Sequence, residues 1–156
     1  MNITYRRAEP SDIEKLIEVR LQLIDEDSGL TLEEKEALYA SIKEYMDSAM
    51  SSDTFFAYLA FDGDTFVGTC SMNLYCVLPG KKLPNGKNAY LQNMHVAPLY
   101  RRKGIALKLA GLVMDEAKQR GHTRIVLHAT ESGKLLFEKC GFTSDIKTLS
   151  HMVYFE

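Results

Sequence analysis

The feature that most constrains this chain is a glycine that stands where a short apolar strand is expected to give way to a helix. The stretch 90–96 has the pattern of a strand, and the basic turn Arg101-Arg102-Lys103-Gly104-Ile105-Ala106 follows it. A glycine at such a junction lets a ligand approach the backbone, and the first turn of a helix offers N–H groups that have no partner within the helix. With the positive end of the helix dipole, these donors predict a site for a diphosphate.

Length and composition limit the class of protein. The 156 residues, 46% hydrophobic and 26% charged, predict a single domain over residues 1–156. A net charge of −2 argues against a nucleic-acid-binding protein. The three cysteines show no Cys-x-x-Cys spacing, so we expect neither a disulfide scaffold nor a metal site. The chain has no apolar signal core and no segment long enough to span a membrane, which predicts a cytoplasmic protein without a membrane partner.

The pattern along the chain predicts an α/β (α+β) fold in the order β-α-α-β-β-β-α-β-α-β, with helices on the faces of a mixed sheet. A capping box of Ser11 and Glu14 is expected to start the first helix, and the acidic stretch 25–29 is expected to be a flexible link. Asp62-Gly63-Asp64 predicts a hairpin turn. The expected strands are 3–8, 55–61, 65–77, 89–96, a buried strand 124–129 and a final strand 148–155; the later helices are 32–50, 104–120 and 131–140.

Three kinds of phosphate site combine a strand, a glycine turn and a helix. A dinucleotide fold requires Gly-x-Gly-x-x-Gly and an acidic residue about 20 residues further on, and the chain has neither at this turn. The Gly-x-x-x-x-Gly-Lys-Ser/Thr pattern of a P-loop is absent from the sequence. A loop for the pyrophosphate of coenzyme A is the third kind, and it fits.

The segments NMHVAPLYRRKGIA and VLHATESGKLLFEKCGF resemble the GNAT superfamily of acyl-CoA-dependent N-acyltransferases. Arg101, Gly104 and Ala106 stand at the defining places of the family's Arg/Gln-x-x-Gly-x-Gly/Ala loop. The run Leu136 to Phe142 matches its closing helix, Leu-Tyr-Glu-Lys-x-Gly-Phe, and YRRAEPSDIEKL is typical of its first strand and helix. The resemblance implies a mostly antiparallel sheet of six to seven strands with helices on both faces.

By this resemblance, the chain transfers an acetyl group from acetyl-CoA to a primary amine of a small molecule, amino acid or peptide, by direct attack in a ternary complex. Backbone amides of residues 102–106 would hold the pyrophosphate, and the strand around 94–96, splayed from the next one, would pair with the pantetheine arm. A homodimer is expected by analogy with the family. The implied cofactor-binding residues are Met94, His95, Val96, Arg101, Arg102, Lys103, Gly104, Ile105, Ala106, Thr130 and Phe137.

The chain departs from the family pattern at three positions. Gln92 stands where a carboxylate is common, and it cannot act as a base. Phe137 replaces the tyrosine that protonates the leaving thiolate in many members, and Thr130 replaces an asparagine. These departures leave open an alternative, an acyl-CoA-binding module with impaired catalysis and a regulatory role. The candidate catalytic residues are Gln92, Asn93 and His128; for His128, packing in the core is an equal interpretation.

Acceptor-binding residues are harder to find by pattern. Alternation along the strand puts His95 and Asn93 opposite Met94 and Val96, which are expected to face the core. Two interpretations of the acidic stretch 25–27 stay open, a solvated loop and a surface that attracts cationic amines. The candidate substrate-binding residues are Tyr39, Tyr45, Tyr75, Gln92 and Asn93.

Overall fold

A five-stranded sheet forms the centre of the computed structural model, which describes residues 1–144 and 152–156. The strands lie in the order β1-β2-β3-β4-β5, and all neighbours are antiparallel except β4 and β5. The predicted α+β class and mixed, mostly antiparallel sheet are confirmed, with five strands in the described residues instead of six to seven. The strands are β1 (Ile3–Arg7), β2 (Phe55–Asp62), β3 (Thr65–Cys76), β4 (Lys87–Val96) and β5 (Arg124–Val126).

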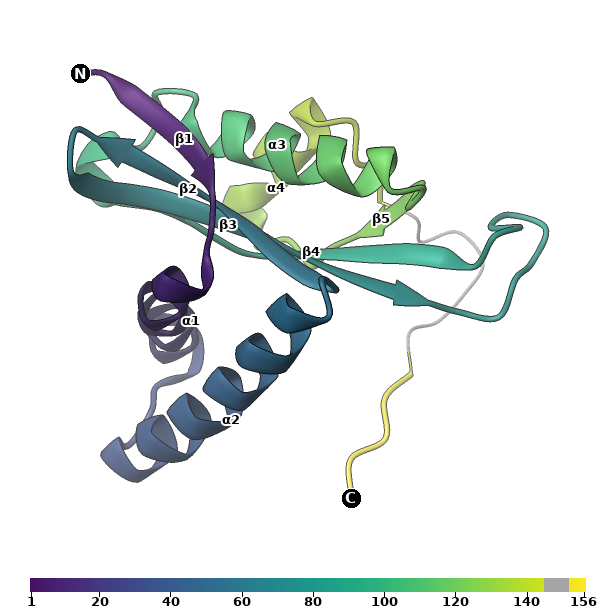
Figure 1. Ribbon diagram of the computed structural model, residues 1–156, viewed down its shortest axis with the longest axis horizontal. Helices are drawn as coiled ribbons and strands as arrows, with labels where there is room; N and C mark the ends of the chain where they lie inside the picture. The colour runs from purple at the N-terminus through teal and green to yellow at the C-terminus, as the bar shows by residue number, and fades with distance from the viewer. Residues whose placement is uncertain (145–151) are drawn as a thin grey trace.

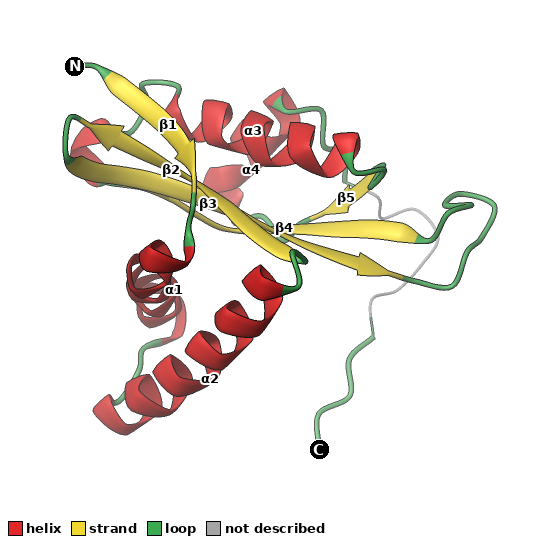
Figure 2. Ribbon diagram, viewed as in Figure 1, coloured by secondary structure: helices red, strands yellow, loops and turns green. Residues whose placement is uncertain are grey.

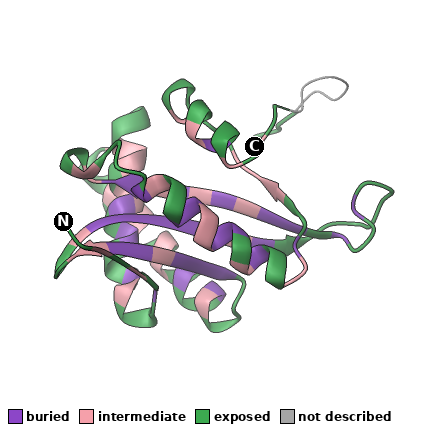
Figure 3. Cartoon of the chain, turned by 90° about the horizontal axis from the view of Figure 1, so that it is seen from above, coloured by how far each residue is buried: buried purple, intermediate pink, exposed green. Residues whose placement is uncertain are grey.

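Helices cover both faces of this sheet (Figures 1 and 2). Helices α1 (Ile13–Ser28) and α2 (Leu32–Ser51) pack on one face, and α3 (Ile105–Gln119) and α4 (Glu131–Lys139) pack on the other. Alternation along β2 supplies both cores, since Phe55 joins the cluster under α1 and α2 while Phe56 joins the cluster under α3. The middle of the sheet is therefore buried on both sides (Figure 3).

The entry to α1 differs from the prediction. A short 3-10 helix, Pro10–Asp12, precedes α1, and the reciprocal bonds of the capping box join Glu9 and Asp12. The predicted box of Ser11 and Glu14 is wrong, because Pro10 can occupy the first helical position and shifts the start of the helix toward the N-terminus. Asp12 also accepts two hydrogen bonds from Arg6, which fixes the helix start to β1.

The acidic stretch is helical, which corrects the predicted flexible link. Residues 25–28 form the last turn of α1, and the helix ends at Gly29, whose φ of 72° suits a glycine. Asp25 stabilises this turn because its carboxylate accepts a hydrogen bond from the Leu30 N–H and pairs with Lys35 at 3.0 Å. Thr31 and Glu34 then form the capping box that begins α2.

The C-terminal end of the sheet is shorter than predicted. The expected buried strand 124–129 is reduced to β5, in which Arg124 is exposed and the next two residues are half-buried. Among the described residues it pairs with β4 alone, so it lacks the second neighbour that helps to bury a central strand. Of the expected strand 148–155, residues 148–151 lie outside the described residues, and residues 152–155 carry no strand. No helix in the described ranges is long and apolar enough to cross a bilayer.

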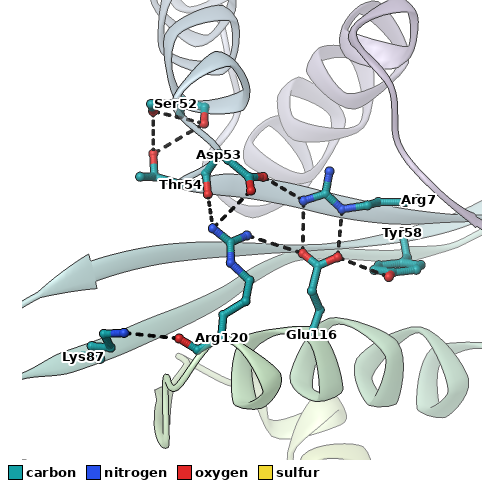
Figure 4. A network of polar contacts seen from close by, with 9 residues as sticks. Arg7, Ser52, Asp53, Thr54, Tyr58, Lys87, Glu116 and Arg120 are labelled. Atoms are coloured by element: carbon teal, nitrogen blue, oxygen red, sulfur yellow. Dashed lines mark hydrogen bonds and ion pairs between the residues drawn. The ribbon is translucent and has the colours of Figure 1, made fainter. Parts of the chain in front are cut away.

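A network of ion pairs fastens α3 to the first strand and to the turn before β2 (Figure 4). Arg7 pairs with Glu116 at 2.8 Å and with Asp53 at 2.9 Å. Arg120 pairs with the same two carboxylates, at 3.6 and 3.3 Å. The network joins three separate parts of the chain, and it therefore holds α3 in place over the sheet.

Candidate functional site

A β-bulge in β4 is the first element of the site. Asn93 has a φ of 58°, and the register of β4 against β3 shifts between the pairs Thr69–His95 and Ser71–Gln92. A bulge inserts one residue and so reverses the alternation of side chains along a strand. Ala89 and Leu91 before the bulge, and Met94 and Val96 after it, all pack on the α3 side of the sheet. Gln92 and Asn93 therefore lie together on the opposite face.

The second element is the open edge of β4. The parallel pairing of β5 with β4 ends at Val126 opposite Tyr90, so the last six residues of β4 have no strand on that side within the described chain. The Ala97 N–H donates to the Val67 carbonyl and so points toward β3. Successive N–H groups along a strand point to alternate sides. The N–H groups of Met94 and Val96 therefore point to the open edge. This arrangement agrees with the predicted splay between the two strands.

The turn after β4 forms the third element, a concave set of backbone donors. Arg102 and Gly104 both have positive φ, 63° and 80°, and α3 begins at the next residue, Ile105. The N–H groups of residues 102–107 make no hydrogen bond with the described part of the chain. Successive unpaired N–H groups at a helix start bind anions. The turn thus has the backbone geometry of an anion-binding site.

The three cations of this turn differ in what they contact. The Arg101 side chain donates to the Val96 carbonyl at 2.9 Å and so ties the turn to the end of β4. Lys103 donates to the Leu99 carbonyl at 3.0 Å and lies over the Tyr100 ring. Arg102 is exposed and bonds to none of the described residues. Arg101 and Lys103 therefore shape the turn, while Arg102 is available to an anion.

The fourth element is a cavity of about 210 Å³ on the α1 and α2 side of the sheet. It lies beside the bulge, on the opposite face of the sheet from α3, the helix that follows the turn. Its floor comes from β2 and β4, and its walls come from the two helices. The lining residues are Arg20, Ser41, Ile42, Tyr45, Met46, Phe55, Gln92 and Asn93.

Two buried polar side chains follow the bulge. Asn93 is 5% exposed; its Nδ2 faces the Leu16 carbonyl at 3.4 Å, and its Oδ1 has no partner among the described residues. His95 is also buried. Burial lowers the pKa of His95 below its usual 6.5, and the Arg101 cation lowers it further, against a smaller opposite effect of Glu26. His95 is thus held in its neutral form near pH 7.

Comparisons with known proteins decide the family. The model of the acetyltransferase (GNAT) family matches residues 20–142. The chain belongs to the GNAT acetyltransferase family. The predicted resemblance is thereby confirmed. A comparison with curated proteins found no match.

Solved structures share the GNAT fold over nearly all of the chain. A predicted acetyltransferase from Clostridium acetobutylicum, solved with acetyl-CoA, is 24% identical, with 97% of this chain and 96% of that chain covered and a TM-score of 0.83. A GCN5-related N-acetyltransferase from Ralstonia eutropha is 20% identical, with 97% and 99% covered and a TM-score of 0.83. Glucosamine-6-phosphate N-acetyltransferase from Arabidopsis thaliana is 21% identical, with both chains covered to 100% and a TM-score of 0.70. At these identities the likeness shows the fold alone.

Of the predicted acceptor residues in this GNAT member, the structure brings three together at the cavity: Gln92, Asn93 and Tyr45. Tyr39 instead donates its hydroxyl to Glu14, between the two helices. Tyr75 accepts a hydrogen bond from the Asn88 side chain at 2.6 Å and does not line the cavity. The sequence pattern named both residues as candidates, but it could not show which way an aromatic side chain points.

Three other predicted residues of the GNAT member have local roles. His128 is exposed and not part of the core, and its Nδ1 is hydrogen-bonded to the Tyr90 hydroxyl at 2.5 Å. Thr130 caps α4 by accepting from the Gly133 N–H at 3.2 Å. Phe137 is buried in the core and packs edge-to-face against Phe142. Its phenyl ring has no proton to donate.

Sequence reasoning missed most of the cavity wall, including Arg20 and Ser41. Arg20 carried a signal, because it lies on the face of α1 with apolar residues three and four positions away on both sides: Leu16, Ile17, Leu23 and Ile24. A cation on an otherwise apolar helical face is expected to make a specific contact. The contributions of α2 and β2 could not be assigned before the two elements were placed against each other.

Proposed function

We propose that this GNAT family member transfers an acetyl group from acetyl-CoA to a primary amine of a small molecule, amino acid or peptide, by direct attack within a ternary complex. One observation carries the proposal: the open edge of β4 and the cavity meet on the same few residues. The amide of Met94, which no described strand pairs on the open edge, follows directly on Asn93, which lines the cavity. A donor bound along the edge and an acceptor in the cavity would thus meet at the bulge.

The residues of the turn fit the cofactor. Its unpaired amides can receive the pyrophosphate, with Arg102 as a further cation. A Cβ built on Gly104 would meet no atom of residues 1–144 or 152–156 within 4 Å, so the backbone here is open to a ligand. The N–H groups of Met94 and Val96 can pair with amide and thioester carbonyls along the edge. Donors that are fixed before the reaction stabilise an oxygen on which negative charge develops.

When bound, acetyl-CoA supplies the acetyl thioester. The chain must orient the amine and receive its proton. Gln92 and Asn93 would orient the amine with their side-chain amides. His128 would receive the proton through the Tyr90 hydroxyl, since Tyr90 lies two residues before Gln92 on the same face of β4.

The amine nitrogen forms the new C–N bond, and the C–S bond breaks. The thiolate of coenzyme A leaves without help from Phe137 and takes its proton from the solvent. An acyl-enzyme is not part of the proposal, because burial raises the pKa of the Cys70 and Cys140 thiols and so disfavours the reactive thiolate. A cytoplasmic location and a homodimer stay predictions.

The test is a screen of the purified chain with acetyl-CoA and a broad panel of amines that includes amino acids, peptides, polyamines and amino sugars. Release of free thiol, with an acetylated amine of matching amount by mass spectrometry, is expected for at least one class. Acetyl-CoA that binds without thiol release on any amine would contradict the proposal. That result would favour the alternative, an acyl-CoA-binding module.

A further inference from the structure

The cavity beside the bulge carries one formal charge among its described lining residues, and that charge is the Arg20 guanidinium. Arg20 is half-buried, and it makes no hydrogen bond or ion pair with the described part of the chain. Its own helix offers no compensation, because the residues three and four positions away are all apolar. Exposed cations of the same helix layer are paired by contrast, as Lys15 is with Glu18 and Lys43 with Asp47.

A partly buried guanidinium with no partner is costly, because burial removes water that the protein does not replace. Arginine offers five donors in a planar fork that matches a carboxylate. An anionic group in the cavity would restore the lost hydrogen bonds, while a second cation would be repelled.

An independent observation points to the other end of such a ligand. Asn93, on the floor of the same cavity, has its Oδ1 buried and without a partner in the described part of the chain. The orientation of its amide is set by the Leu16 carbonyl, which can only accept and therefore takes the Nδ2 side. An unpaired carbonyl oxygen requires a hydrogen-bond donor, and an amine supplies one.

We infer that the acceptor is a small amine that also carries a carboxylate, as free amino acids do, with Asn93 Oδ1 facing the amine and Arg20 binding the carboxylate. The inference rests on the proposed function and narrows it to one substrate class. The side chains of Ile42, Met46 and Phe55 supply an apolar wall for the carbon skeleton between the two groups. The size agrees, since the cavity of about 210 Å³ is smaller than the ~300–1,000 Å³ usual for drug-sized ligands.

A carboxylate accounts for the single arginine better than a phosphate does. A phosphate monoester carries nearly two negative charges near pH 7 and is usually held by several donors. The described lining has no second cation and no helix start. The acidic last turn of α1 does not neutralise Arg20, since Asp25 is paired with Lys35 and no described carboxylate pairs with Arg20.

The test compares each common L-amino acid with its α-amide, which keeps the amine and the side chain but removes the carboxylate. Glucosamine 6-phosphate and glucosamine form a second pair that probes a phosphate. Free thiol is followed with saturating acetyl-CoA. The amine of an amino-acid amide loses its proton more readily, so intrinsic reactivity favours the amide. A higher kcat/KM for the acid therefore reports recognition of the carboxylate, and we expect a ratio of 10- to 100-fold, on the order of one charge-assisted contact.

Arg20→Gln should remove the preference for the acid over the amide. The KM for the acid should rise 10- to 100-fold, about the effect of one charge-assisted contact, while the KM for acetyl-CoA stays unchanged. Arg20→Lys should restore part of it, because the charge is kept and the planar fork is lost. Arg124→Gln, on the exposed edge strand β5, is the matched control and should leave the ratio unchanged. Thermal unfolding and acetyl-CoA binding by calorimetry confirm that each variant is folded.

The outcomes separate the inference from the proposed function. Equal or faster turnover of the amides, or a ratio that Arg20→Gln leaves intact, would overturn the inference and leave amine acetylation standing. Preference for glucosamine 6-phosphate over every amino acid would overturn the carboxylate assignment. If none of the amines tested led to thiol release, the proposed function would be overturned, and the inference with it.

Discussion

Gln92 and Asn93 line the same cavity although they are consecutive residues of β4. In a regular strand they would point to opposite faces. The positive φ of Asn93 creates the bulge that brings them together, and the same bulge turns Met94 back toward the α3 side. One backbone irregularity thus places these two cavity-lining residues and the open amides of β4 next to each other.

The bulge predicts that two substitutions of Asn93 affect different properties, one the catalytic rate and the other the stability. Asn93→Gly keeps the left-handed conformation at no steric cost but removes Oδ1, so kcat/KM for the amine should fall about 10-fold, the effect of one hydrogen bond. Asn93→Val should lower the free energy of unfolding by at least ~1–2 kcal/mol, since a β-branched residue is strained there. Urea denaturation checks this difference. A valine variant as stable as the natural chain would contradict the role of the bulge.

The turn after β4 gives a prediction about the cofactor. Gly104→Val should raise the KM for acetyl-CoA by 10-fold or more, about the effect of losing one charge-assisted contact, and leave the KM for the amine nearly unchanged. Valine is strained at the φ of 80°, and its side chain would stand among the amides proposed to bind the phosphate. Gly111→Ala is the control, as this helical glycine also has free space around it. It should stabilise α3 by about 1 kcal/mol without affecting either KM. A folded Gly104 variant with normal acetyl-CoA affinity would refute the assignment of the loop.

The pair of Tyr90 and His128 is expected to move the proton of the amine. His128→Ala and Tyr90→Phe should each lower kcat by roughly 100-fold, the lower end of the effect of a positioned base, with an unchanged KM for acetyl-CoA. The loss should shrink as the pH is raised, because the amine then arrives already deprotonated. A pH–rate profile of both variants measures this. A loss independent of pH would show that the pair has only a structural role.

His95 predicts how stability depends on pH. The pKa of His95 is lowered in the folded chain, so folding favours its neutral form. The resulting contribution to the free energy of unfolding is fully present above pH 6.5, the usual pKa of histidine. As the pH falls below 6.5 and through the lowered pKa, folding loses that contribution. His95→Gln should therefore flatten the acid side of a plot of unfolding free energy against pH. A plot that keeps the same slope as that of the natural chain would contradict the assignment.

The sequence predicted those parts of the fold and site that depend on local pattern. Gly104 and the residues around it were found because a turn and a helix start are local features, and β2 and β3 were found from alternation. The bulge could not be found, because Asn tolerates positive φ in many contexts and only the register against β3 reveals it. The surroundings of Tyr75 and Tyr39 could not be predicted, because the partners that hold them, Asn88 and Glu14, are set by how the elements pack.

Direct transfer at the meeting point of β4 and the cavity is the central claim, and initial-rate kinetics test it most directly. The rate of thiol release is measured with acetyl-CoA and the best amine of the screen, each varied at several fixed concentrations of the other. Because both substrates must be bound before the C–N bond can form, double-reciprocal plots should give intersecting lines. Parallel lines would show that acetyl is first passed to the protein and would contradict the account.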